Sequence, residues 1–232
     1  MSTYGANDIA EFTARLAELR ATLSAPVEAG TFVTYTDGAC FGNPSGNGGW
    51  AAAVFQPDVE ARWLLFGHLS STSNNRAEAL GVLAAMEWVP DGSKLEVHAD
   101  SELTVRQLQG RYKIKSNTDI WELIQRARDQ KRLLVTPEWV RGHAGDPLNE
   151  LADQLSKLGA MNGRIEDLSG LVEVAPPAVP PELVGLEPRT DWEREFLASV
   201  TQQLQRGRAL SEKQQAVVER MRTNVRRGSP RA

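Results

Sequence analysis

Four acidic residues fall where predicted strands or helices end, at positions that a sheet would bring to one rim: Asp37, Glu78, Asp100 and Asp153. Apolar strand patterns precede both Asp37 and Asp100. If those two strands are parallel neighbours, the two carboxylates leave the sheet side by side. Clustered carboxylates repel one another unless a cation lies between them. Hard divalent cations that take oxygen ligands, chiefly Mg²⁺ or Mn²⁺, are the natural occupants of such a site.

Each of these acids taken singly also has a purely structural explanation. Asp37-Gly38 is a hairpin-turn signal that ends the first strand, and Glu78 suits the first turn of a helix. Asp100-Ser101 suits a strand end that leads into a helix cap. Their joint placement is what favours a metal site.

Alternating strand and helix patterns over residues 31–160 must position these side chains. Three strand-like runs come first and predict an antiparallel meander: 32–35, 50–55 and 63–69. Helical spacing then alternates with two further strands. The helices are expected at 75–89, 101–109, 119–131 and 148–158, and the strands at 95–99 and 133–140. This order predicts an α/β fold with a five-stranded mixed sheet flanked by helices.

The N-terminal segment, residues 1–29, predicts an amphipathic helix. Its apolar residues run from Ile9 to Leu23 at steps of three and four, with Asn7 as the cap and Pro26 beyond the end. The same spacing is a heptad seam, but a short one. We therefore expect a monomer with this helix docked on its own domain, and keep a coiled-coil dimer as the alternative.

The C-terminal part divides into a proline-rich linker, 163–189, and a basic helical hairpin with a tail, 190–232. Two capping-box patterns predict helices at 191–206 and 212–226. Residues 203–232 hold eight Arg or Lys against two Glu. With a catalytic domain at 30–162, these segments complete the expected organisation of the chain.

Composition and cysteine use limit the class of protein. The chain has 232 residues, of which 41% are apolar and 24% charged, which excludes general disorder and fibrous repeats. No apolar run approaches the roughly 18 residues of a membrane span, and the first residues lack a signal-peptide pattern. The single cysteine, Cys40, has no partner for an internal disulfide. We expect a cytoplasmic protein without a membrane partner.

Five motifs, in order and spacing, resemble ribonuclease HI over residues 31–160, a little over half of the chain. They are Tyr35–Pro44, Ser73–Glu78, Asp100-Ser101, Trp139–Gly145 and Asn149–Asp153. The resemblance implies hydrolysis of the RNA strand of RNA–DNA hybrids with two Mg²⁺ ions, leaving 5′-phosphate and 3′-hydroxyl ends.

The resemblance also assigns roles to individual residues. It implies that Asp37 bridges both ions, that Asp153 completes the ion that activates water, and that Glu78 with Asp100 holds the other ion. His143, in a loop with two glycines, would move a proton during hydrolysis or product release.

Substrate contacts follow from the same resemblance, because a hybrid differs from duplex DNA in its 2′-hydroxyls and groove shape. Gly38, Ala39 and Asn75 match positions at the RNA strand or its neighbours. Asn43 and Ser73 match positions near the DNA strand or its phosphate. A turn and a helix cap are the structural alternatives for these residues.

Two departures from the family pattern bear on substrate binding. Glu102 replaces the Gln of many relatives and adds negative charge where a phosphate-bearing ligand approaches. The connection 109–119 is short, with only three bases, so we expect weak hybrid binding and a shallow salt dependence for the catalytic domain alone. We hypothesise that the basic tail supplies further phosphate contacts through Arg206, Arg208, Lys213, Arg220, Arg222, Arg226 and Arg227.

Two other functions remain open at this point. The fold could serve a non-catalytic nucleic-acid adaptor, although acids that repel phosphate have no purpose in a binding module. Alternatively the substrate could differ, for example double-stranded RNA or DNA junctions.

Overall fold

The chain forms two compact units, Met1–Pro176 and Pro177–Ala232, in the computed structural model. The structure describes residues 7–59, 61–142, 144–162, 182–183, 186, 188, 190–205 and 209–227. The boundary between the units falls inside the predicted linker, most of which lies outside the described residues.

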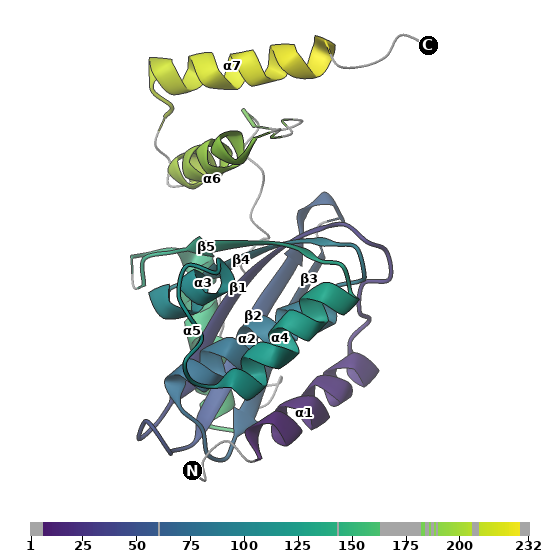
Figure 1. Cartoon of the computed structure of the whole chain (residues 1–232), viewed down its shortest axis with the longest axis vertical. Coiled ribbons are helices and arrows are strands. Elements are labelled where there is room, and N and C mark those ends of the chain that lie inside the picture. The colour runs from purple at the N-terminus through teal and green to yellow at the C-terminus, as the bar shows by residue number, and fades with distance from the viewer. Residues whose placement is uncertain are drawn as a thin grey trace. The chain divides into compact units, whose positions relative to one another are not determined.

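The first unit is built on a five-stranded mixed sheet in the order β3-β2-β1-β4-β5 (Figure 1). Its strands are β1 (Thr31–Cys40), β2 (Gly48–Gln56), β3 (Ala61–Leu69), β4 (Lys94–Ala99) and β5 (Leu134–Trp139). The first three strands pair antiparallel, whereas β4 runs parallel to both β1 and β5. The predicted α/β fold, with its meander and parallel β1–β4 pair, is confirmed.

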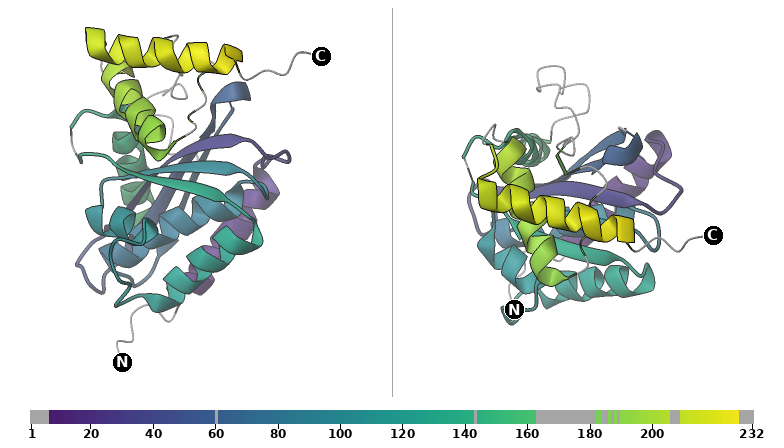
Figure 2. Two further views of the ribbon diagram at one scale, coloured as in Figure 1. Left: turned by 45° about the horizontal axis from the view of Figure 1, so that its top comes forward. Right: turned by 90° about the horizontal axis from the view of Figure 1, so that it is seen from above.

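Helices cover both faces of this sheet, and Figure 2 shows the sheet between these layers. One face carries α1 (Asp8–Thr22), α2 (Asn74–Trp88) and α4 (Thr118–Gln130), and the other carries α5 (Pro147–Ala160). A shorter helix, α3 (Glu102–Leu108), follows β4, and a 3₁₀ turn, η1 (Pro57–Val59), follows β2. None of the helices in the described parts of the chain is long and apolar enough to cross a membrane.

Strand β2 shows why the sequence requires two helical layers. Trp50, Ala52 and Val54 are buried against α1, α2 and α4, while the alternate residues Ala51, Ala53 and Phe55 are buried against α5. A strand without a polar face is stable only when both of its faces are covered. The continuous apolar run in the sequence therefore specifies a central strand.

The N-terminal helix is part of the core of the first unit. Its seam residues Phe12, Leu16 and Leu19 are at most 6% exposed, and the Phe12 ring meets Trp50 edge-on with centroids 5.0 Å apart. The seam that could have made a coiled coil is thus packed inside this chain. Asn7 stands at the cap position as predicted, but its side chain makes no capping hydrogen bond.

Two local expectations were wrong. Asp37-Gly38 is no turn: both residues lie within β1 and pair with Ala51 and Trp50 of β2. The reason is the antiparallel β1–β2 ladder, which continues to Cys40, whereas the parallel pairing of β1 with β4 stops at Tyr35. Asp37 therefore lies just past the point where β1 loses one neighbour. Glu78 lies in the second turn of α2 and not the first, since the helix already begins at Asn74.

The second unit contains α6 (Asp191–Gln205) and α7 (Glu212–Arg227), packed around Leu183, Val200 and Val218. Both predicted capping boxes are present. The Thr190 hydroxyl accepts from the Glu193 amide at 3.1 Å, and the Glu193 carboxylate accepts from the Thr190 amide at 3.2 Å. Ser211 and Gln214 make the same reciprocal pair. Among the predicted basic tail residues, Arg206 and Arg208 lie outside the described residues.

Gly49 allows α5 to pack directly on β2, and replacing it should destabilise the fold. A Cβ at this position would lie 2.2 Å from the Ser156 carbonyl oxygen and 2.3 Å from the Ala160 amide nitrogen. We predict that Gly49→Ala lowers the free energy of unfolding by about 3 kcal/mol, because α5 must move outward. Gly92→Ala, at φ +77° with no atom within 4 Å, should lower it by only about 1 kcal/mol through backbone strain. Urea unfolding compares the two, and equal losses would contradict the explanation.

Candidate active site

Two of the predicted acids, Asp37 and Asp100, lie at the carboxyl edge of the parallel β1–β4 pair. Asp37 is in β1 and Asp100 directly follows β4. Two residues earlier on each strand, the rings of Tyr35 and His98 stack with centroids 4.5 Å apart. Because side chains alternate along a strand, the carboxylates continue the face that this stack occupies.

Helix α5 supplies the hydrogen bonds that hold these two carboxylates. Ser156 Oγ donates to Asp37 Oδ2 at 2.6 Å, and Asn149 Nδ2 donates to Asp100 Oδ2 at 3.2 Å. Asp153 lies between these donors at helical spacing, so Asn149, Asp153 and Ser156 share one face of α5. The helix thereby brings a third acid to the same edge of the sheet.

The fourth acid comes from α2, which approaches β1 closely at a glycine. A Cβ at Gly38 would lie 2.2 Å from the Glu78 backbone nitrogen, so only glycine permits this approach. The Glu78 Oε2 atom accepts a hydrogen bond from Thr104 Oγ1 of α3 at 3.0 Å. Gly38, a predicted substrate contact, therefore also has a structural reason to be glycine.

Burial and mutual repulsion act on the two innermost acids. Burial raises the pKa of Asp37 to about 6; the Ser156 hydrogen bond opposes this rise, and the charges of Asp100 and Asp153 add to it. Burial raises the pKa of Glu78 to about 7, with Asp37 and Asp100 adding to the rise and hydrogen bonds from Ser101 and Thr104 opposing it. The four acids thus form one electrostatic cluster.

The donor chemistry of this cluster fits a hard divalent cation, but the geometry is open. All four acids offer carboxylate oxygens, the ligands that Mg²⁺ prefers. Within the described residues, however, no three His, Cys, Asp or Glu side chains stand close enough to form a metal cage. Asp153, for example, is paired with Lys157 at 2.7 Å on its own helix. That ion pair is partly exposed and therefore weak, so a cation could replace it at small cost.

His143 lies outside the described residues, so the structure assigns it no position. Its loop nevertheless begins at the acid cluster. A Cβ on Gly142 would lie 2.8 Å from Asp100 Oδ2, which places the backbone of this loop against the Asp100 carboxylate.

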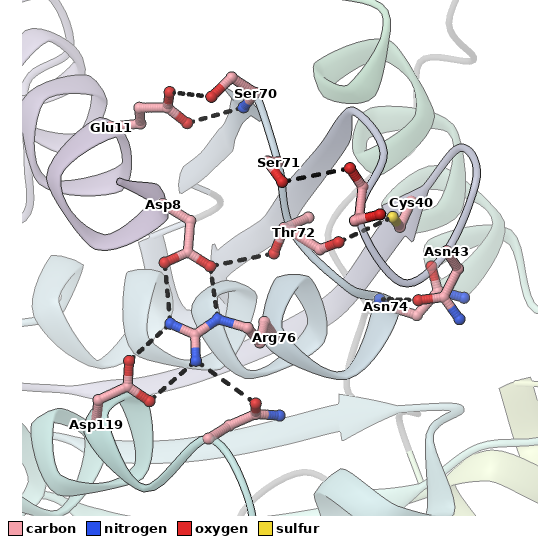
Figure 3. A network of polar contacts seen from close by, with 12 residues as sticks. Asp8, Glu11, Cys40, Asn43, Ser70, Ser71, Thr72, Asn74, Arg76 and Asp119 are labelled. Carbon is pink, nitrogen blue, oxygen red and sulfur yellow. Dashed lines mark hydrogen bonds and ion pairs between the residues drawn. The ribbon is translucent and has the colours of Figure 1, made fainter. Parts of the chain in front are cut away.

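The predicted substrate contacts gather in two places. Gly38 and Ala39 lie in β1, whereas Ser73 and Asn75 lie at the start of α2. Asn43, in the turn after β1, reaches the second group, since its Oδ1 accepts from the Asn74 amide at 3.2 Å (Figure 3). Ser73 occupies the N-cap position of α2, but its side chain makes no capping hydrogen bond, which weakens the helix-cap alternative for this residue.

Sequence reasoning missed three groups that hold the acids: Asn149, Ser156 and Thr104. A signal for two of them was present, because Asn149 and Ser156 stand four residues before and three after Asp153 on a predicted helix. The added charge of Glu102 is paired within α3, where Arg106 Nε lies 3.4 Å from its carboxylate. This exposed pair offsets part of the repulsion expected for a phosphate-bearing ligand.

Comparison with known proteins identifies the family of the first unit. The family model described as RNase H matches residues 29–161, which include the whole sheet and all four acids. The Ribonuclease H of Rhizobium meliloti is 35% identical over 138 residues, which are 54% of this chain and 87% of that protein. The Ribonuclease HI of Caulobacter vibrioides is 37% identical over 139 residues, 54% of this chain and 89% of that protein.

Among solved structures, the N-terminal RNase H domain of rv2228c from Mycobacterium tuberculosis, fused to maltose binding protein, superposes with a TM-score of 0.50 and 26% identity. The match covers 56% of this chain and 94% of that one. The family match and the named relatives identify an enzyme of the ribonuclease H class. This chain belongs to the RNase H family.

The raised pKa values of Asp37 and Glu78 predict how stability depends on pH without divalent metal. Both pKa values lie above those of the unfolded chain, so the folded state binds more protons and stability falls as pH rises from about 4 to about 7. Asp37→Asn removes one of these charges. We expect the variant to be more stable than the wild type at pH 8 by about 1 to 2 kcal/mol, with no gain at pH 4.

Urea unfolding in the presence of chelator measures both values. The exposed Asp58, on η1, provides the matched control, and Asp58→Asn should show no such pH-dependent gain. A gain for Asp37→Asn of the same size at both pH values would contradict the assigned cause.

Proposed function

We propose that this chain is a metal-dependent endonuclease that hydrolyses the RNA strand of RNA–DNA hybrids, leaving 5′-phosphate and 3′-hydroxyl ends. The observation that carries the proposal is the acid cluster of Asp37, Glu78, Asp100 and Asp153 at one edge of an RNase H-family sheet. Curated relatives that cover the same region bear the name ribonuclease H.

Asp37, Glu78, Asp100 and Asp153 would hold two Mg²⁺ ions, or Mn²⁺ in their place. Bound there, the ions would make hydroxide available near neutral pH and stabilise charge on the phosphoryl transition state. Asp37 and Glu78 must lose their protons to serve as ligands, and with pKa values of about 6 and about 7 they do so near neutral pH. His143 would move a proton to or from the reacting groups.

The protein frame around the cluster has a defined part in this proposal. Ser156 and Asn149 fix the orientation of the Asp37 and Asp100 carboxylates from α5. Burial of the site strengthens every charge interaction in it, because less water screens the charges. Clustered carboxylates repel phosphate when ionised, so they have no purpose in a module that only binds nucleic acid, which argues against a non-catalytic adaptor.

Hybrid recognition would use short polar and backbone groups at Gly38, Ala39, Asn43, Ser73 and Asn75. These residues lie on β1, in the turn after it and at the start of α2, and they can read 2′-hydroxyls and groove shape without long side chains. Double-stranded RNA and DNA junctions remain the alternative substrates.

The first test is cleavage of an RNA–DNA hybrid labelled on its RNA strand, beside duplex DNA and duplex RNA. We expect the full chain to cut only the hybrid, with Mg²⁺ or Mn²⁺ and not with chelator. Asp100→Asn should lower kcat about a thousandfold, since one metal ligand is lost, while hybrid affinity in chelator stays within about threefold. Asp58→Asn should leave both unchanged.

Three outcomes decide between the candidate functions. A folded wild-type chain that cuts no hybrid with either metal would remove the proposed function. Cleavage of another duplex in preference to the hybrid would change the substrate. Full hybrid cleavage by Asp100→Asn would exclude the assigned acid cluster.

The basic α7 is proposed as a second, weaker phosphate contact. Lys213 and Arg220 are exposed, whereas Arg222 is paired with Glu219 at 3.1 Å. We predict that the double variant Lys213→Gln/Arg220→Gln weakens hybrid binding and reduces the slope of log affinity against log salt by about one to two. Arg126→Gln/Arg128→Gln, on α4, removes the same charge and should leave the slope unchanged. Identical slopes for both double variants and the wild type would exclude a role for α7.

A further inference from the structure

The N-terminal helix α1 makes polar contacts with the segment Ser70–Arg76, which runs from the end of β3 into the first turn of α2, in addition to its apolar packing (Figure 3). Glu11 holds the start of this segment with both carboxylate oxygens. Its Oε2 accepts from the Ser70 amide at 2.8 Å, and its Oε1 accepts from the Ser70 hydroxyl at 2.6 Å. A single side chain of α1 therefore fixes both the backbone and the side chain of Ser70.

Asp8, one turn earlier on α1, holds the other end of the segment. It is fully buried and accepts two hydrogen bonds from the Arg76 guanidinium, at 2.7 and 2.9 Å, and one from Thr72 Oγ1 at 3.2 Å. Asp119 of α4 binds the remaining side of the guanidinium at 2.7 and 3.0 Å. Burial alone would lower the pKa of Arg76, but the two carboxylates raise it above its usual range, so the group stays cationic.

The opposite side of the segment contacts the turn between β1 and β2. The Thr72 amide donates to the Gly46 carbonyl at 3.1 Å, and Ser71 Oγ donates to the Ser45 carbonyl at 3.3 Å. On the same side, Asn43 Oδ1 accepts a hydrogen bond from the backbone amide of Asn74. The segment that carries Ser73 and leads to Asn75 thus lies between α1 and the turn that carries Asn43.

The start of α2 needs such a support because its own cap does not supply one. Ser73 stands at the N-cap without a side-chain capping bond, so local chemistry does not fix how the chain enters the helix. Contacts from Asp8 and Glu11, more than fifty residues away in sequence, fix it together with the contacts from the turn that carries Asn43.

We propose that α1 is a positioning element for substrate binding: through Asp8 and Glu11 it holds Ser70–Arg76 in the conformation that presents Ser73 and Asn75 to the nucleic acid. The proposal rests on the proposed function, since the nucleic acid is the RNA–DNA hybrid named there. In the described part of the chain, the Asp8 and Glu11 side chains bond to Ser70, Thr72 and Arg76 and not to the acids of the active-site cluster.

Glu11→Ala in the full chain tests the proposal, because Glu11 is only partly buried and its loss should not unfold the protein. We expect hybrid affinity in chelator, measured by fluorescence anisotropy, to fall about three- to tenfold, with KM rising in parallel and kcat within about twofold of wild type. Hydrogen exchange should quicken at Ser70–Asn75 and stay unchanged in β2. Glu11→Gln, which keeps an oxygen acceptor for the Ser70 amide, should restore much of the affinity.

Glu18→Ala provides the matched control, since Glu18 lies on the same helix and, among the described residues, its side chain bonds only to Arg15. It should leave affinity, KM and local exchange at wild-type values. The proposal is overturned if Glu11→Ala binds hybrid like the wild type, or if Glu18→Ala weakens binding equally. A wild-type chain that binds no hybrid would defeat the proposed function and this proposal's substrate together, while the exchange data would still show whether α1 holds the segment.

Discussion

Carboxylates that share a buried edge repel one another. The first unit contains hydrogen-bond donors that stabilise these carboxylates in spite of the repulsion. Parallel pairing of β1 with β4 delivers Asp37 and Asp100 to one edge, and the strand geometry leaves no way to separate them. Neutral side chains on neighbouring helices donate hydrogen bonds to the acids of the cluster: Ser156 and Asn149 on α5, and Thr104 on α3. Neutral donors stabilise a carboxylate without cancelling its charge, so the cluster keeps its attraction for a cation.

Close approach of helices to the sheet is the second requirement of the same arrangement. Side-chain donors as short as serine reach a strand carboxylate only when the helix backbone lies against the strand. Gly38 allows this for α2 and Gly49 for α5, since a Cβ at either position would overlap helix backbone. The glycines thus determine how near the acids and their donors can come.

The sheet, the order of the strands and the edge that bears the acids were predictable, because alternation, helical spacing and the handedness of parallel connections leave few topologies. The Asp37-Gly38 turn was mispredicted because a dipeptide reports only local preference, while a neighbouring strand decides whether β1 continues. The capping boxes of α6 and α7 were predicted correctly because their partners lie only three residues apart, so local sequence determines them. Asp8 and Arg76 are 68 residues apart, and no local pattern relates them.

The apolar seam of α1 has a consequence for where the catalytic unit begins. The family match starts at residue 29, whereas Phe12, Leu16 and Leu19 fill the same core as Trp50 and Leu80. A fragment cut at the family boundary would uncover that core and remove the Asp8 carboxylate that pairs with Arg76. The region shared with relatives is therefore smaller than the cooperative unit of this chain, and homology limits alone do not mark where it can be divided.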